Sequence, residues 1–550
     1  MIMGSNRRLA NVKTRREVGL DYVMQSIDLN TPFGKNQLKE IKPYYPGQEA
    51  ELNAEFDKVE QMVCFVQENA KFVEQIQELF MEIKDVSYSI ERAKTQTLSV
   101  VEIYEIKSLL LCMRRLQQLS VKDETLLIPA EYQLEDTTDL LDVLDPRRDR
   151  INTFYIYDEF SELIRELRGK KRELEIAIRK EQKVRREEIR KEYGINLTPK
   201  FDISVSKNNK DFEKIQSIED LEMVDQDYMS ATFQLKANEV VYGYMKQMDE
   251  LVVLMDEEEE RIRKDISLKI SGHEETLKHN CDRIGALDLA LGKALFAVAH
   301  ECTRPEIVSE HILEIEEGRN LQVEGILKSK GKTYCPVSIG LKQGVTCITG
   351  ANMGGKTISL KLSGQVMILT QYGFFVPAKH ARVGLSNYMQ ILVGDSQSVE
   401  RGLSTFGSEM EELKFMLDNS VDRTLLLIDE IASGTNPVEG LALSKSLVDY
   451  LMKKPYIALM TTHFETVTEK EGVVNMQVRG LADANFTLLN REIQYAKKSE
   501  RINIISKYMD YRLYRVEKQG EVPKDALNIA KMLGISSEII EGAQKYIKGE

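Results

Sequence analysis

The residues best suited to chemistry lie in a glycine-rich run at residues 350–357, GANMGGKT. Spaced glycines let the backbone curl so that successive N–H groups point inward at an anion. Lys356 would then meet the outer phosphates of a nucleotide, and Thr357 would bind Mg²⁺. An apolar run precedes the glycines and helical spacing follows from Ile358 to Leu369, as a phosphate-binding loop requires. The sequence therefore predicts an ATP and Mg²⁺ site whose loop residues are Gly350, Asn352, Gly354, Gly355, Lys356 and Thr357.

Two acidic residues follow a second apolar run, Leu425 to Ile428. Asp429 would hold Mg²⁺, and Glu430 would polarise the attacking water. A third apolar run, residues 456–461, precedes His463, which is a candidate sensor of the γ-phosphate. The carboxyl ends of parallel strands share one edge of a sheet, so we expect these side chains to meet there. In the alternative, the acids only begin a loop and the histidine is structural, but that leaves their order behind a phosphate loop unexplained. We therefore expect Glu430, His463 and Lys356 to be the catalytic residues.

Four segments in this order resemble the ATPase of the MutS family: GANMGGKT, STFGSEM at 404–410, LLLIDEIASGTNPVEG at 425–440 and TTHF at 461–464. Residues 394–406 and 436–440 are closer to the shorter, recombination-suppressing MutS branch. The resemblance implies an α/β phosphate-loop ATPase domain of the ABC type, preceded by an all-α core and a lever or coiled-coil region. It also implies a dimer, with a homodimer expected, in which Ser404, Thr405 and Phe406 complete the partner's nucleotide site. The sequence departs from the family at Ala351, where proline is usual, and at Arg319-Asn320, where arginine-histidine-proline is common.

Length and composition predict a multidomain protein of about three units. The net charge of −13 excludes a surface that is uniformly basic, so any DNA contact must come from a local basic patch. The six cysteines form no close pairs, which favours neither a zinc site nor a disulfide framework. The basic N-terminus has no apolar signal core, and no run of about eighteen apolar residues is present. We therefore expect a cytoplasmic protein without a membrane segment.

The resemblance and the helical periodicity together predict four parts. These are a helical core at 1–157, a lever arm with a reduced clamp-like tip at 158–285, a return to the core at 286–310, and the ATPase at 311–550. The entry at residues 20–43 looks like the start of the shorter branch, so we expect no mismatch-reading module before it. Phe72 and Phe80, each followed by Glu two residues later, are interpreted as core packing. The chain stops at Glu550, and so the small C-terminal nuclease domain of that branch is not expected.

A long charged helix is predicted at residues 159–193, with possible strands at 201–205 and 231–235 and a returning helix from Met245 to Ile284. Between Arg165 and Lys191 there are twelve basic and six acidic side chains, a local charge of +6. This stripe could bind a DNA backbone, or it could be the solvated face of a coiled coil. The basic residues proposed for DNA contact are Lys170, Lys171, Arg172, Arg179, Lys180, Lys183, Arg185 and Arg186.

The last segment, Pro523 to Ile547, predicts two helices joined by a turn at Gly534, with one apolar stripe. A DNA-reading helix would not open with Ser536-Ser537-Glu538, so the pair is interpreted, by resemblance, as the MutS dimerisation motif. Three functions remain open. The chain could be a DNA clamp in repair or recombination, a protein-remodelling ATPase such as a reactivating partner of a cobalamin-dependent aminomutase, or a structural subunit of a larger complex.

Overall fold

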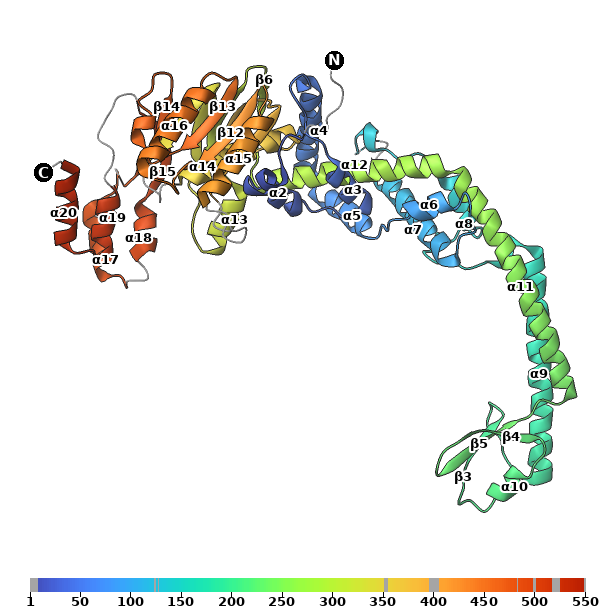
Figure 1. Ribbon diagram of the computed structural model, residues 1–550. Helices are drawn as coiled ribbons and strands as arrows, with labels where there is room; N and C mark the ends of the chain where they lie inside the picture. Colours follow the sequence, from blue (N-terminus) through green and yellow to red (C-terminus); the bar gives the residue numbers. More distant parts are fainter. Residues whose placement is uncertain are drawn as a thin grey trace. The chain divides into compact units, whose positions relative to one another are not determined.

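The computed structural model describes residues 8–122, 125–126, 128–350, 355–394, 405–481, 483–497, 501–516 and 525–548 (Figure 1). The chain forms two compact units. One comprises residues 1–77 and 285–550, and the other residues 78–284. The chain therefore leaves the first unit after its N-terminal helices and returns to it near Gly285. The four predicted parts divide the chain differently and remain a prediction.

A six-stranded sheet forms the centre of the first unit, in the order β11-β12-β13-β9-β14-β15. Five strands pair in parallel and β15 is antiparallel to β14. The strands are β9 (Gly344–Thr349), β11 (Tyr388–Leu392), β12 (Thr424–Asp429), β13 (Tyr456–Thr461), β14 (Val474–Gly480) and β15 (Asp510–Arg515). The predicted α/β fold of the C-terminal half is confirmed.

Both faces of this sheet are covered by helices, which explains why its central strands are continuous apolar runs (Figure 1). Leu425 and Leu427 of β12 belong to one core cluster with α14 (Lys356–Gln371). Leu426 and Ile428 belong to another with α15 (Thr405–Asn419) and α16 (Pro437–Leu451). Alternate residues of β12 therefore pack against helices on opposite faces of the sheet.

The other described strands of this unit form a four-stranded sheet in the order β6-β10-β7-β8. Its members are β6 (Glu306–Val308), β7 (Ile312–Gly318), β8 (Val337–Lys342) and β10 (His380–Gly384), with α13 (Leu321–Ser329) between β7 and β8. Arg319 and Asn320, where the chain departs from the family pattern, precede this helix. Asn320 accepts a hydrogen bond from Val323 N (3.1 Å) and so caps α13.

The N-terminal helices of the first unit are α1 (Val12–Glu17), α2 (Leu20–Ser26), α3 (Pro32–Glu40), α4 (Glu49–Glu68) and the beginning of α5 (Ala70–Met81). Asp288 of α12 (Glu274–Ala299) holds the start of α3, because its carboxylate accepts from Thr31 N and Thr31 Oγ1, each at 2.7 Å. Burial raises the pKa of this carboxyl. A Cβ at Gly34 would lie 2.5 Å from Asp288 Oδ2, so the glycine is required by close approach.

The second unit begins with helices α6 (Ser87–Arg92), α7 (Val100–Leu119) and α8 (Thr138–Leu144), and with the short strands β1 (Val121–Lys122) and β2 (Thr125–Leu126). Phe80 is fully buried, which confirms its interpretation as core packing, and Phe72 of the same helix packs edge-on against Phe65. Lys107 is also fully buried. Its ammonium donates to Asp145 Oδ1 (3.1 Å) and Thr153 O (2.9 Å), which satisfies the buried charge.

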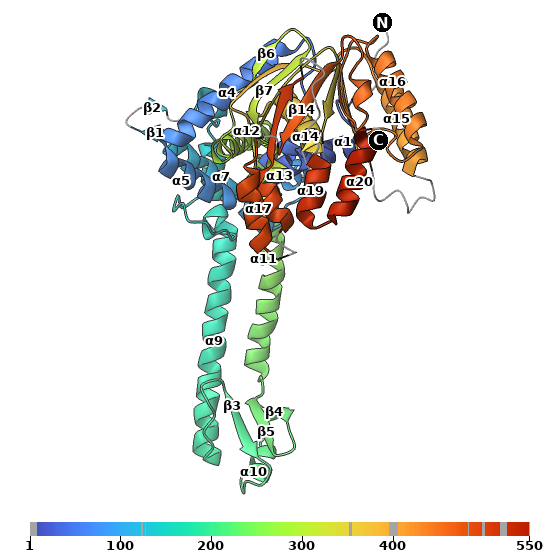
Figure 2. The same ribbon diagram turned by 90° about the vertical axis from the view of Figure 1, so that its left-hand side faces the viewer.

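The long helices α9 (Glu162–Tyr193) and α11 (Glu239–Gly272) pack along each other in this unit (Figure 2). Between them the chain forms β3 (Asp202–Ser206), α10 (Phe212–Gln216), β4 (Leu221–Gln226) and β5 (Ser230–Leu235). These strands make a small antiparallel sheet in the order β3-β5-β4. The predicted returning helix is interrupted at His273, where α11 ends and α12 begins.

The C-terminal segment contains α17 (Phe486–Tyr495), α18 (Arg501–Tyr508), α19 (Asp525–Leu533) and α20 (Ser537–Lys548). The predicted helix, turn and helix are confirmed, with Gly534 at φ +96°. The predicted single apolar stripe is split. Ile529 and Ile540 are buried, whereas Leu533, Ile535 and Ile539 are exposed.

Candidate nucleotide site

Three parallel strands deliver the predicted site residues to one edge of the six-stranded sheet. In the register of the sheet, Asp429 pairs with Thr461, and Thr461 pairs with Ile348. The residues that follow these positions therefore leave the sheet at the same end, as the sequence predicts.

Lys356 lies at the N-terminus of α14, directly after Gly355, which has φ +79°. Its side chain is only 3% exposed, and its ammonium has three partners. These are Gly350 O at 3.0 Å, Glu430 Oε1 at 3.1 Å and His463 Nδ1 at 3.4 Å. The lysine thus connects the phosphate loop to both predicted catalytic side chains.

His463 and Glu430 form the next contact, with 2.8 Å between His463 Nε2 and Glu430 Oε1. An ammonium group can only donate, so His463 Nδ1 accepts from Lys356 and Nε2 carries the proton that is donated to Glu430. Glu430 has φ +47°, and its N–H donates to Thr461 Oγ1 (3.0 Å) and Thr461 O (3.2 Å). The strand end therefore fixes the direction of the Glu430 side chain.

Thr357 and Asp429 also converge, with 2.8 Å between Thr357 Oγ1 and Asp429 Oδ2. The other oxygen of Asp429 accepts from Thr461 Oγ1 at 2.6 Å. A hydroxyl and a carboxylate are the hard oxygen ligands that Mg²⁺ prefers. Together with the open N-terminus of α14, this oxygen pair fits the predicted ATP and Mg²⁺.

Other predicted residues of the site lie partly or wholly outside the described residues. Asn352, Gly354 and Ser404 lie outside them, as does the side chain of Thr405. Phe406 is described, and it packs against the core cluster of its own chain on the face of α15 and α16.

Two residues of the site were missed from the sequence. Thr461 holds both Asp429 and Glu430, and Glu409 of α15 accepts a hydrogen bond from Ala432 N at 3.0 Å. Thr461 could have been found from the sequence, because it is a hydroxyl residue at the end of the third apolar strand. Nothing in the spacing of Glu409 distinguishes it from Glu411 and Glu412 beside it.

The predicted DNA-binding helix, α9, is present, but some of its basic residues are engaged within the chain. Arg185 is buried, and its guanidinium donates to Lys236 O and pairs with Asp220. Arg186 lies over the ring of Phe201 at 6.0 Å. The prediction that Arg185 offers its charge to DNA is therefore wrong, because that charge is satisfied internally.

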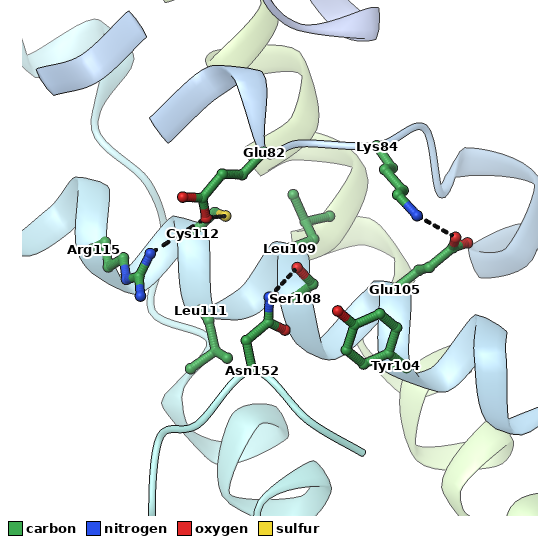
Figure 3. A pocket seen from close by; sticks show the side chains of 10 residues that line it. All are labelled: Glu82, Lys84, Tyr104, Glu105, Ser108, Leu109, Leu111, Cys112, Arg115 and Asn152. Carbon is green, nitrogen blue, oxygen red and sulfur yellow. Dashed lines mark hydrogen bonds and ion pairs between the residues drawn. The ribbon is translucent and has the colours of Figure 1, made fainter. Parts of the chain in front are cut away.

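A separate hollow of about 380 Å³ lies in the second unit (Figure 3). Its charged walls are paired, Glu82 with Arg115 at 3.3 Å and Lys84 with Glu105 at 3.1 Å. Burial raises the pKa of the Cys112 thiol there to about 11, which disfavours a nucleophilic thiolate. Within the described ranges no three or more His, Cys, Asp or Glu side chains gather into a group that could hold a metal ion. Among the helices of these ranges, none combines the length and the apolar composition of a membrane span.

Comparisons with known proteins agree with this geometry. Residues 346–549 match the family model of MutS domain V. The chain is 29% identical to the DNA mismatch repair protein MutS of Carboxydothermus hydrogenoformans, over 60% of this chain and 37% of that protein. It is 30% identical to the Endonuclease MutS2 of Symbiobacterium thermophilum, over 55% of this chain and 35% of that protein. The chain thus spans little more than a third of the length of these relatives. The phosphate loop and the acidic strand end both lie within the matched residues, so the C-terminal part of the chain is similar to domain V of the MutS family.

Proposed function

We propose that this protein is an ATPase that works as a homodimer and uses ATP to open and close a clamp on DNA, in repair or recombination. The observation that carries the ATPase assignment is the convergence of Lys356, Thr357, Asp429, Glu430 and His463 at one sheet edge. The names of the relatives, a DNA mismatch repair protein and an endonuclease, support the DNA-related role.

In the proposed reaction, the N–H groups at the start of α14 and the ammonium of Lys356 bind the phosphates of ATP. Thr357 and Asp429 would hold Mg²⁺, which would supply positive charge against the outer phosphates. The γ-phosphate takes the ammonium of Lys356 away from Glu430, so the carboxylate becomes available to accept a proton from the attacking water. His463 donates from Nε2 and is placed to contact the γ-phosphate once Glu430 turns to the water.

The dimer is proposed from two features. Ser404, Thr405 and Phe406 resemble the segment that completes a partner's site. The helix pair α19 and α20 leaves Ile535 and Ile539 46% and 63% exposed, although both are large apolar side chains. Exposed apolar side chains on a helix pair fit a protein contact better than a DNA contact.

The clamp is assigned to α9, α11 and the small sheet between them, which would act as a lever arm with its tip. Of the eight basic residues of α9 predicted to contact DNA, five are exposed and remain candidates for phosphate contact after Arg185 and Arg186 are set aside, whereas Lys171 is half-buried. The five are Lys170, Arg172, Arg179, Lys180 and Lys183.

The ATPase assignment predicts that Glu430→Gln keeps ATP binding but slows hydrolysis by about 10²- to 10⁴-fold, the usual contribution of a positioned general base. Lys356→Ala should weaken binding itself. Titration with Mg²⁺ and ATP would measure affinity, and single-turnover phosphate release would measure the chemical step. Glu471→Gln, at an exposed acid away from the sheet edge, is the matched control. Hydrolysis at the rate of the unchanged protein in Glu430→Gln would rule out the role given to this carboxylate.

A further inference from the structure

The contact between α9 and α11 has the spacing of a coiled coil. Positions alternate by three and four residues on each helix, and every one of them is buried or half-buried. On α9 they are 164, 167, 171, 174, 178, 181 and 185, and on α11 they are 241, 244, 248, 251, 255, 258 and 262. The two helices contact each other within one chain (Figure 2). Buried or half-buried positions at this spacing are the ones expected to face the neighbouring helix.

Helix α11 has a second stripe with the same spacing, at positions 242, 245, 249, 252 and 256, and it is exposed. Tyr242 is 69% exposed, Met245 44% and Val252 36%, and the adjacent Val253 is 57% exposed. Asp249 and Asp256 occupy the remaining positions. Large apolar side chains at heptad spacing on a helix are typical of a helix-binding face.

Helix α9 has a matching exposed stripe that is basic, made of Arg165, Arg172, Ile176, Arg179, Lys183 and Arg190. Its apolar member, Ile176, is 68% exposed. Residues 239–260 of α11 contain eight acidic and one basic side chain, a local charge of −7, against the +6 of α9. Arg168 and Glu259 form an ion pair between the two helices at 2.8 Å, whereas Arg172, Arg179, Lys183, Asp249 and Asp256 make no ion pair in the described chain. The charges of these five side chains are therefore not used in ion pairs within the described chain.

We propose that the acidic and apolar stripe of α11 binds the basic stripe of α9 from a second copy of this chain, so that two helix pairs join into a four-helix contact. Both halves of the contact are on every chain, which is the condition for a self-complementary twofold interface. The inference rests on the proposed dimer only in that the dimer holds two arms in one assembly and so raises their effective concentration. DNA would compete for the same basic stripe, so the contact belongs to arms that are not holding DNA.

The expected register gives a direct test by disulfide trapping. We place the twofold axis of this contact along the two arms, so that positions that are level within one chain are also level between chains. The intrachain ion pair of Arg168 and Glu259 then puts Ile176 of one copy level with Val252 of the other. The full chain with Ile176→Cys and Val252→Cys, and with the exposed Cys64 changed to Ser, should form a covalent dimer on mild oxidation in the absence of DNA. In the control, Leu254→Cys replaces Val252→Cys, because Leu254 is exposed outside the stripe. The control should give little dimer.

Charge reversal in the chain with Ile176→Cys, Val252→Cys and Cys64→Ser distinguishes a specific contact from chance collisions between the two cysteines. Asp249→Lys with Asp256→Lys should remove most of the covalent dimer, and so should Arg172→Glu with Arg179→Glu. The variant with all four changes restores opposite charges and should recover the dimer. Failure to cross-link, or equal cross-linking in all of these variants, would overturn the inference. ATP hydrolysis measured in the Asp249→Lys and Asp256→Lys variant keeps the result separate from the proposed function, because these two carboxylates lie outside both the nucleotide site and the residues proposed for DNA contact.

Discussion

At the residue scale, the turn after β12 depends on a carboxylate that is not itself one of the predicted catalytic groups. Glu430 and Ala432 both have left-handed backbone conformations, at φ +47° and +61°. Such conformations persist only where the surroundings hold them. The Ala432 N–H donates to Glu409 Oε1, and burial raises the pKa of Glu409. We infer that Glu409 keeps this turn, and hence Glu430, in place for the reaction.

Glu409→Ala should therefore lower kcat by about 10- to 100-fold, the cost of misplacing a reacting group by about 1 Å. The KM for ATP should change little, because Lys356 and Thr357 remain. Glu409→Gln retains an acceptor oxygen and should recover much of the rate. Steady-state hydrolysis across an ATP titration would measure both constants, with the exposed Glu411→Ala as control. Equal rates in the Ala and Gln variants would contradict a positioning role.

The convergence of Lys356, Asp429 and His463 could be predicted because each follows an apolar strand and parallel strands end at a common edge. The contact of Glu409 could not be predicted in this way. Its partner is a backbone N–H more than twenty residues later, and a main-chain donor leaves no trace in the sequence.

At the element scale, apolar runs and helical periodicity predicted the central strands and the long helix α9 well. Strand β4 was missed because its sequence LEMVDQ has one buried residue, Leu221, and acidic residues on an exposed edge. The burial of Arg185 could not be predicted either, since an arginine on a basic stripe reveals its partner Asp220 only once the chain folds back.

A second prediction at this scale concerns the proposed DNA contact of helix α9. Arg179→Glu with Lys183→Glu should weaken binding to all duplex sequences alike and flatten the salt dependence, since each phosphate contact contributes about 0.9 to its slope. Basal ATP hydrolysis should persist. Lys328→Glu with Lys330→Glu makes the same change of net charge at exposed positions in the unit that carries the nucleotide site, outside the proposed clamp, and is the control. Unchanged affinity and slope in the α9 variant would exclude this helix as the DNA contact and favour a protein client.

At the scale of the whole molecule, the central claim is that two chains share their nucleotide sites, so that hydrolysis in one chain depends on the other. The similarity of residues 346–549 to MutS domain V supports this claim. So does the position of Ser404 just before α15, the helix that carries Glu409 to the turn of Glu430. The predicted partner contact and the chain's own catalytic turn are thus joined by one short helix.

Mixing two inactive variants tests this claim most directly. Lys356→Ala and Ser404→Ala chains should each hydrolyse ATP poorly, because every dimer of one variant has the lesion in both sites. In a mixed dimer, one composite site has both lesions and the other has neither, so part of the ATPase activity should return after the subunits exchange. Exchange can be followed separately with differently tagged chains. Recovery in proportion to the mixed dimer is the predicted result, and no recovery in a sample with proven exchange would contradict shared sites.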